Sequence, residues 1–265
     1  MTEQPAPTAE SVEPTGTAGR ARARRARTGV VRIGGALTLV VAGAGLVGWL
    51  APGGLGDPDP IRITDGLSAA GYRTVVDAVA GAPGWLHRAV ELATDAALLV
   101  LLGLLAVIGW AGHGRNPLLL AGAGLTLVVT AGAYGLSEGL KLVVDQERPC
   151  RALSGVEPMA TCPAVGDWSF PSNHATIAAA LAVGLAVVVP KLALVTLPLA
   201  GATALLRVVA GVHYPHDILA GLTLGGVLAA GTVAVATAPT ARLLHALRLA
   251  PTRKAAPGPT PGRTR

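Results

Sequence analysis

The chain of 265 residues is 51% hydrophobic, 14% charged and 3% aromatic, with a formal net charge of +6 and only two cysteines. This composition excludes a disordered protein, which has few apolar residues and much charge, and a disulfide-stapled secreted domain, which needs more cysteines. The apolar residues stand in nearly charge-free runs of roughly twenty, which are typical of membrane-spanning helices rather than of a soluble core. We therefore predict an all-α, polytopic membrane protein.

Basic residues gather at the two ends of the sequence. Residues 1–32 hold six arginines and three glutamates, and residues 239–265 hold six basic residues and no acidic one. Basic segments beside apolar spans mark the cytoplasmic side of a membrane, whereas a nucleic-acid-binding protein places its cations on a folded face with stacking aromatics. The sequence therefore predicts cytoplasmic tails and no nucleic-acid partner.

Six apolar runs predict a six-transmembrane-helix bundle, with spans at 33–50, 92–111, 117–140, 175–189, 192–206 and 218–238. Three regions follow: a disordered basic cytoplasmic tail (1–32), a six-helix membrane domain (33–240) and a second basic cytoplasmic tail (241–265). A weakly amphipathic stretch near 67–80 is expected at the membrane surface. Only Pro190 and Lys191 separate the fourth and fifth runs. We interpret them as a turn, because one continuous helix would put the flanking polar clusters on opposite membrane faces.

The orientation follows from the basic residues. Both tails, Arg115 and Lys191 fall on one side, which we assign to the cytoplasm of a multi-pass plasma-membrane protein. Cys150 and Cys162 then share an extracytoplasmic loop, where a disulfide is allowed, although spacing alone leaves two unpaired thiols possible. In the last span, a glycine pair spaced by four matches the small-residue pattern of helix contacts, which also arises by chance in so glycine-rich a chain.

Three clusters of ionisable residues interrupt the apolar sequence, each at the predicted outer end of a span. They are Lys141 with Arg148, then Pro171-Ser172-Asn173-His174, then Arg207 with His213 and Asp217. Their order and spacing resemble the tripartite signature of the type 2 phosphatidic acid phosphatase superfamily, which also includes vanadium-dependent haloperoxidases. The resemblance covers about residues 141–217 and implies a helical bundle in which a histidine attacks a phosphate ester.

Two positions depart from the family pattern. Asn173 stands where the family usually has glycine, and Leu206 stands where it often has serine. Asparagine is the non-glycine residue that best tolerates a positive φ, so we expect Asn173 to keep the shape of an anion pocket. The change at Leu206 removes an accessory hydroxyl.

The residue types suit phosphoryl transfer, in which negative charge spreads over the oxygens of the transferred group. The predicted phosphate-binding residues are three cations and the start of the fourth span, whose backbone N–H groups form an anion site: Lys141, Arg148, Arg207, Ser172 and Asn173.

The same clusters supply the reacting groups. His213 is the predicted nucleophile, in agreement with the resemblance, and Asp217, one helical turn later, is expected to hold its imidazole in the attacking tautomer. His174 is the predicted general acid and then general base. We predict no metal ion and no other cofactor, because the cations already neutralise the phosphate and the acidic loop residues lack the spacing of a two-metal site.

The leading hypothesis is a metal-independent membrane phosphatase that hydrolyses a lipid phosphate at the extracytoplasmic face through a phosphohistidine. Phosphatidate, phosphatidylglycerol phosphate and a polyprenyl diphosphate are equal candidates. The alternatives are a phosphotransferase of the same superfamily, a haloperoxidase, which is disfavoured because such relatives are soluble, and a non-catalytic transporter or scaffold that binds anionic lipid. The sequence leaves the oligomeric state open.

Overall fold

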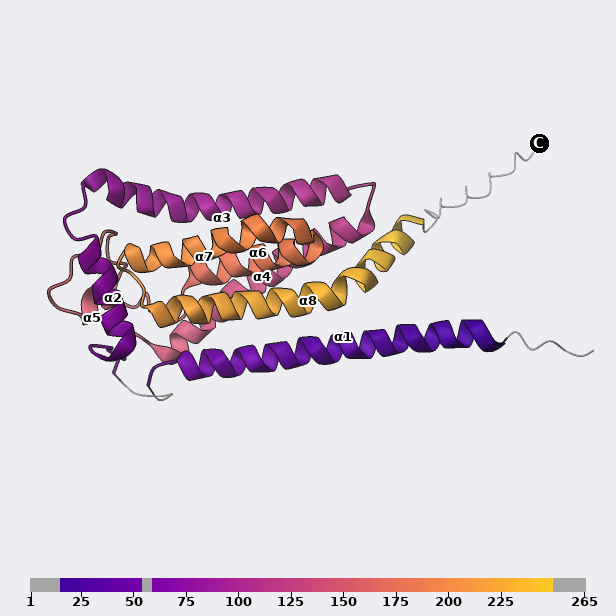
Figure 1. Cartoon of the computed structure of the whole chain (residues 1–265), viewed down its shortest axis with the longest axis horizontal. Helices are drawn as coiled ribbons and strands as arrows, with labels where there is room; N and C mark the ends of the chain where they lie inside the picture. The colour runs from indigo at the N-terminus through magenta and orange to yellow at the C-terminus, as the bar shows by residue number, and fades with distance from the viewer. Residues whose placement is uncertain (1–14, 54–58, 250–265) are drawn as a thin grey trace, which may run out of the picture.

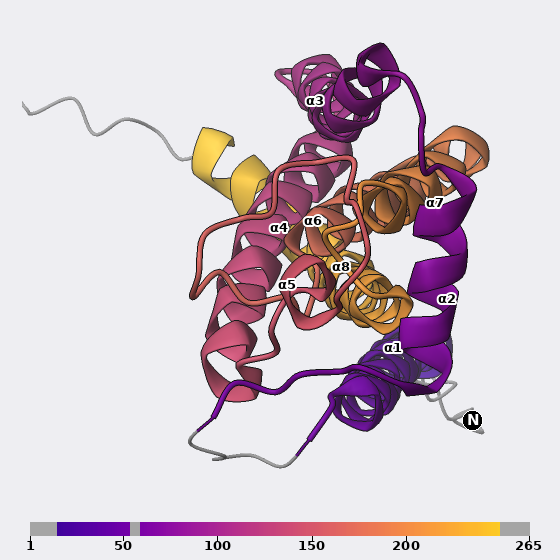
Figure 2. The ribbon, with the colours of Figure 1, turned by 90° about the vertical axis from the view of Figure 1, so that its left-hand side faces the viewer.

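The computed structural model describes residues 15–53 and 59–249, and within these ranges it contains helices and no β-strand. The long helices run side by side, and α2 lies across one end of the bundle (Figure 1, Figure 2). In chain order the helices are α1 (Thr15–Leu50), α2 (Gly66–Ala78), α3 (Gly84–Gly112), α4 (Pro117–Val144), α5 (Pro149–Ala152), α6 (Asn173–Val188), the 3-10 turn η1 (Pro190–Leu192), α7 (Ala193–Val209) and α8 (Pro215–Leu249).

The described part of the chain has five helices that are long and apolar enough to cross a membrane: α1, α3, α4, α8, and α7 together with η1. The remaining predicted span, 175–189, is the fourth in chain order and corresponds to α6, which is apolar but has only 16 residues. At 1.5 Å per residue it is about 24 Å long, shorter than the roughly 30 Å hydrocarbon core. The all-helical membrane fold is confirmed, whereas the count of six spans is not.

The predicted tails differ from the structure in one respect. Helix α1 already begins at Thr15 and α8 continues to Leu249, so 15–32 is helical where disorder was predicted, and 241–249 is helical as well. The Ala- and Arg-rich sequence of this part of α1 explains the difference, since both are strong helix formers. The rest of the two predicted tails, 1–14 and 250–265, lies outside the described residues.

Local sequence sets the helix ends as expected. The Asn116 side chain accepts hydrogen bonds from the backbone N–H groups of Leu118 and Leu119, and Pro117 occupies the first turn of α4. Pro190 and Lys191 form η1, which reverses the chain between α6 and α7. The predicted turn is therefore present, and both polar clusters that flank these helices reach the same end of the bundle.

Glycines bring α8 against the start of α6. A Cβ atom at Gly225 would lie 2.0 Å from the Thr176 carbonyl oxygen, and one at Gly221 would lie 2.6 Å from the Ser172 carbonyl oxygen. The backbone N–H of Ser172 also donates to the Asp217 carbonyl at 3.1 Å. The glycine pair is thus a real contact, because any larger side chain would separate the two helices.

Helix α2 closes the same end of the bundle. The Tyr72 hydroxyl donates to the Gly211 carbonyl at 2.8 Å, and the Tyr214 hydroxyl donates to the Ile63 carbonyl at 2.6 Å. Gly211 has φ +79°, and a Cβ there would lie 2.7 Å from Pro158. Only glycine fits this turn, which leads directly into His213.

Candidate active site

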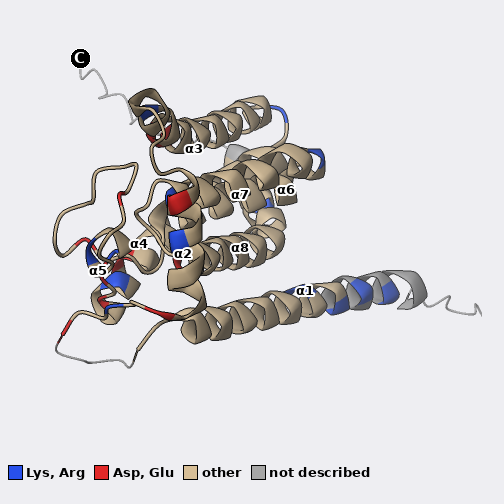
Figure 3. Ribbon diagram, turned by 60° about the vertical axis from the view of Figure 1, so that its left-hand side comes forward, with Lys and Arg blue, Asp and Glu red and all other residues tan. Residues whose placement is uncertain are grey.

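The three polar clusters meet at the end of the bundle that carries α2 and α5 (Figure 2). Lys141 lies in the last turn of α4, Arg148 immediately precedes α5, and Ser172 caps α6. Arg207 lies in the last turn of α7, and Asp217 lies in the first turn of α8. In Figure 3 the ribbon is coloured for charged residues at this end, while the middle of the bundle carries almost none.

His213 and Asp217 form a buried pair. The His213 Nδ1 atom lies 3.4 Å from Asp217 Oδ2 and 3.4 Å from the Ser169 hydroxyl, and on the other side of the ring Nε2 lies 3.2 Å from Arg148 Nη1. A guanidinium has only donors, so Nε2 is the accepting nitrogen of a neutral ring and Nδ1 carries the proton that faces the carboxylate. This tautomer leaves the lone pair of Nε2 directed toward the cations.

The protein strongly favours the neutral form of this imidazole. Burial, followed by the charge of Arg148, lowers the pKa of His213 to about 3, against the opposing effect of Asp217. The charge of Arg207 lowers the pKa of His213 further. At neutral pH the ring is therefore unprotonated, as a nucleophile must be.

Asp217 is fixed by several donors. Its Oδ1 atom accepts from Gln146 Nε2 at 3.0 Å, and its Oδ2 atom accepts from the Ser169 hydroxyl and from the Tyr214 backbone N–H at 2.8 Å. The carboxylate is fully buried. A buried charge is stable only when it is bonded in this way, so the orientation of His213 rests on a rigid partner.

Arg148 is bound on all sides. Its Nε donates to the Asp167 carbonyl at 2.8 Å, its Nη1 donates to the Val212 carbonyl at 3.1 Å, and its Nη2 donates to Asp167 Oδ1 at 2.9 Å. Lys141 Nζ also reaches Asp167 Oδ1, at 3.3 Å, and contacts Glu138 Oε1 at 3.1 Å. Two of the three predicted phosphate-binding cations therefore share one carboxylate.

The bridging carboxylate of Asp167 is ionised. Burial by itself would raise the pKa of Asp167, but the hydrogen bond and charge of Arg148 and the charge of Lys141 outweigh it and lower the pKa. This carboxylate occupies positions on the cations that a phosphate oxygen would use, so an incoming phosphate competes with it.

His174 and Arg207 face an open pocket of about 530 Å³ between α3, α6 and α7. His174 Nε2 lies 3.1 Å from Asp95 Oδ1, a residue of α3. Within the described part of the chain, Arg207 Nε and the Ser172 hydroxyl are buried and have no hydrogen-bond partner. Buried donors of this kind are costly unless a ligand satisfies them, and the oxygens of a phosphate would do so.

Asn173 behaves differently from the expectation. Its side-chain oxygen accepts from the Ser137 hydroxyl at 2.7 Å, and its Nδ2 donates to Glu138 Oε1 at 2.6 Å. Among the described residues, Asp145 is the one non-glycine residue with a positive φ, so Asn173 does not use the left-handed conformation considered from sequence. Its side-chain amide therefore ties α6 to α4.

Cys150 and Cys162 are joined by a disulfide, with their Cα atoms 6.0 Å apart. The bridge connects the start of α5, next to Arg148, to the loop that carries Asp167 and Ser169. The described residues contain no cluster of three or more His, Cys, Asp or Glu side chains that could hold a metal ion.

Sequence reasoning missed several residues of this site. Asp95 is the one charged residue of the apolar run 92–111, and an acidic residue inside a span is costly enough to signal a function. Asp167, Ser169 and Gln146 lie in loops and carry no comparable signal. The missed residues that contact the predicted ones are Asp95, Gln146, Asp167 and Ser169.

Comparisons with known proteins identify the family of this chain. The PAP2 superfamily matches residues 122–240 of the chain. A relative from Mycobacterium tuberculosis, decaprenylphosphoryl-5-phosphoribose phosphatase, is 33% identical over 135 residues, which cover 50% of this chain and 67% of the relative. The same protein from a second strain matches equally. The chain belongs to the PAP2 superfamily.

A solved structure shares the fold. The PAP2-type phosphatidylglycerolphosphate phosphatase from Bacillus subtilis aligns with a TM-score of 0.51 at 20% identity, over 73% of this chain and 92% of that protein. LpxE from Aquifex aeolicus aligns with a TM-score of 0.44 at 21% identity, over 66% of this chain and 99% of that protein. Membership of the family and the membrane-spanning helices make this chain a multi-pass membrane phosphatase related to enzymes of lipid phosphates.

Proposed function

We propose that the protein hydrolyses the phosphate ester of a lipid through a phosphohistidine formed on His213. The observation that carries the proposal is the neutral, buried imidazole whose Nδ1 faces Asp217 and whose Nε2 faces Arg148. In the first step Nε2 bonds to phosphorus while the ester O–P bond breaks. The developing negative charge on the phosphoryl oxygens is stabilised by Lys141, Arg148 and Arg207.

His174 completes the proposed cycle. It gives a proton to the departing alkoxide, and it then takes a proton from the water that attacks the phosphohistidine. The water oxygen bonds to phosphorus and the N–P bond breaks. Inorganic phosphate is released, and His213 returns to its neutral form. Because Nε2 of His174 faces Asp95, Nδ1 is the ring atom that exchanges the proton.

The lining of the pocket favours a substrate that carries hydroxyl groups beside its phosphate. Arg88 and Glu91 of α3 line the same pocket as His174 and Arg207. A carboxylate such as that of Glu91 accepts hydrogen bonds from hydroxyls, which a polyprenyl diphosphate lacks. Together with the substrate in the name of the mycobacterial relative, this supports a sugar phosphate on a polyprenyl lipid over a polyprenyl diphosphate, phosphatidate or phosphatidylglycerol phosphate.

We further propose that the site faces away from the cytoplasm and needs no metal ion. The site lies at the end of the bundle opposite Arg115, Lys191 and the arginines of α1, which the positive-inside rule assigns to the cytoplasm (Figure 3). The three cations of the site supply the positive charge that a metal provides in other phosphatases.

The decisive experiment measures phosphate release by the full chain in detergent from a panel of the four lipid classes. We expect the polyprenyl sugar phosphate to be the best substrate and His213→Ala to lower the rate at least about a thousandfold. His113→Ala, in an exposed turn at the other end of the bundle, is the matched control. Equal rates for His213→Ala and the wild type would overturn the assignment of the nucleophile.

Trapping and chelation test the remaining parts of the proposal. Acid-labile label from a phosphate-labelled substrate should appear on the wild type and be absent from His213→Ala. Label that passes to an added alcohol without release of inorganic phosphate would favour a phosphotransferase, and no turnover of any lipid would favour a non-catalytic scaffold. EDTA should leave the rate unchanged, and a loss of activity would contradict the metal-free reaction.

A further inference from the structure

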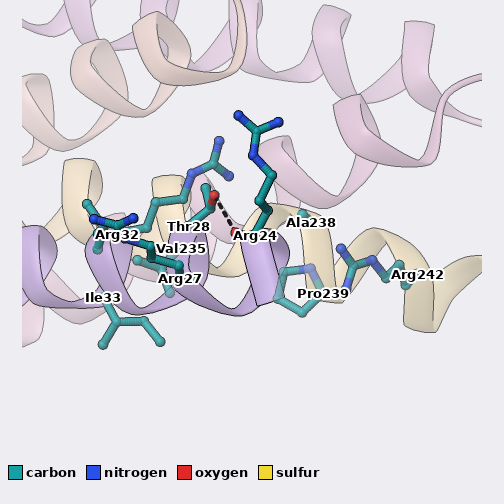
Figure 4. Close-up of a pocket in the computed structure, with 11 residues that line it drawn as sticks. Arg24, Arg27, Thr28, Arg32, Ile33, Val235, Ala238, Pro239 and Arg242 are labelled. Carbon is teal, nitrogen blue, oxygen red and sulfur yellow. Dashed lines mark hydrogen bonds between the residues drawn. The ribbon is translucent and has the colours of Figure 1, made fainter. Parts of the chain in front are cut away.

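A basic pocket lies between α1 and α8 at the end of the bundle opposite the candidate active site. It has a volume of about 1180 Å³, and its polar lining comes chiefly from four arginines: Arg24, Arg27, Arg32 and Arg242. Figure 4 shows that the first three come from α1 and the last from α8. No acidic residue lines the pocket within the described part of the chain.

The four guanidinium groups are available to an external anion. All four side chains are exposed, and none makes an ion pair with another described residue. Such a concentration of like charges from two helices is unfavourable by itself, because nothing within the described residues neutralises it. An anion with several negative oxygens would remove the repulsion and bind the planar donors of the guanidinium groups in pairs.

An apolar pocket continues from the basic one toward the middle of the bundle. Its volume is about 630 Å³, and Arg32 and Ala238 line both pockets. Deeper in the bundle it is bounded by Leu39 of α1 and Val188 of α6, among other apolar residues. The seven residues from Arg32 to Leu39 correspond to about 10 Å along α1, which is enough for several methylene groups of an acyl chain.

Loose packing of α1 leaves this space open. In the apolar stretch of α1 that could cross the membrane, only 11% of the residues are buried inside the protein. This share is the lowest among the five candidate spans of the described residues. Helix α1 contacts α8 closely at Gly43, where a Cβ would lie 2.8 Å from Val227, and again near Gly231. The helices separate beyond this contact, toward Arg24 and Arg242, where the basic pocket begins.

We propose that this composite pocket binds an anionic phospholipid, with the phosphate of the headgroup on the arginines and an acyl chain in the apolar part. A cationic opening above an apolar cavity matches the amphipathic shape of a lipid, whereas a soluble anion would use the arginines alone. A lipid with two phosphates satisfies four cations better than a lipid with one. We therefore expect cardiolipin to bind more tightly than phosphatidylglycerol, and phosphatidylcholine to bind least. The site is independent of the proposed catalytic residues.

The test compares two variants with the same loss of charge. Arg27, Arg32 and Arg242 are replaced together by Gln in the pocket variant, and Arg20, Arg115 and Lys191 are replaced together by Gln in the control variant. Native mass spectrometry of the full chain in detergent measures the retention of added cardiolipin. We expect the pocket variant to bind cardiolipin at least about tenfold more weakly and the control to change by less than about twofold. Equal losses in the two variants would overturn the proposal.

Two further measurements separate the apolar part from the headgroup site. Ala234→Phe fills the apolar pocket without a change of charge, and it should weaken retention of cardiolipin. Millimolar glycerol 3-phosphate should fail to displace the lipid from the wild type. Unchanged retention by Ala234→Phe, or displacement by glycerol 3-phosphate, would contradict a lipid site. Phosphate release in detergent by the pocket variant should equal that of the wild type, so these results do not depend on the catalytic proposal.

Discussion

His174 Nε2 lies 3.1 Å from Asp95 Oδ1, although the two residues are 79 positions apart and belong to α6 and α3. Both predicted reacting histidines thus lie beside a carboxylate: Asp217 for His213, which it shares with His216, and Asp95 for His174. Asp217 is fully buried, which suits the fixed orientation that a nucleophilic His213 needs. Asp95 is largely exposed, which suits a histidine that exchanges protons with water, as proposed for His174.

Replacement of Asp95 by Asn should slow catalysis and leave substrate binding nearly intact. The carboxylate orients His174, so its loss should lower kcat on the order of tenfold, a part of the 10²–10⁴ that a positioned acid or base contributes. The KM should change little, because Asp95 is a positioning residue and not a phosphate ligand. Asp95→Glu should restore part of the rate, and a rise in KM at constant kcat would contradict this role.

Replacement of Asp167 by Asn should strengthen the binding of orthovanadate, which mimics the transition state of phosphoryl transfer. The Asp167 carboxylate competes for Arg148 and Lys141, and its exposure limits the gain to no more than about fivefold. Arg148 should stay in place, since it also donates to the carbonyls of Asp167 and Val212. The inhibition constant of vanadate measures the effect, with Asp167→Glu as the charge-conserving control. Weaker inhibition of Asp167→Asn would show that the carboxylate assists phosphate binding instead.

Acidification should destabilise the protein through His213. The pKa of His213 is about 3 in the folded protein and near 6.5 in an unfolded chain, so between these values only the unfolded state takes up the proton. Stability is therefore retained above about pH 6.5 and falls as the pH drops toward 3. The melting temperature of the wild type should decrease between about pH 7 and pH 4.5 by at least about 3 °C more than that of His213→Gln. Parallel curves for the two proteins would contradict burial of a neutral imidazole.

Replacement of Gly225 by Ala should destabilise the contact between α6 and α8. The added methyl group would lie 2.0 Å from the Thr176 carbonyl oxygen, so the helices must move apart, at a cost of about 1–3 kcal/mol. Gly132→Ala in α4 is the matched control, because nothing lies within 4 Å of a Cβ at that position. Thermal unfolding in detergent should show a lower melting temperature for Gly225→Ala and an unchanged or higher one for Gly132→Ala. Equal stability of the two variants would show that the helices can separate freely.

The apolar runs and turn residues of the sequence determined much of the fold. Charge-free runs of this length must be helical in a membrane. Local chemistry alone marks two of the helix boundaries, at Asn116-Pro117 before α4 and at Pro190-Lys191 after α6. The predicted fourth span, 175–189, lies close to the observed bounds of α6, but a helix of 16 residues is too short to count as a sixth span by length.

The three motifs in the sequence were enough to predict the candidate reacting groups, because each retains its residue types and spacing whatever surrounds it. Only the tertiary structure revealed that Asp95 faces His174, that Asp167 holds two of the cations, and that the Asn173 amide binds α4. The physical reason is the distance along the chain over which each kind of interaction acts. Helix periodicity and turn chemistry act over a few neighbouring residues, whereas these contacts depend on how separate helices and an outer loop pack, which no local pattern of the sequence records.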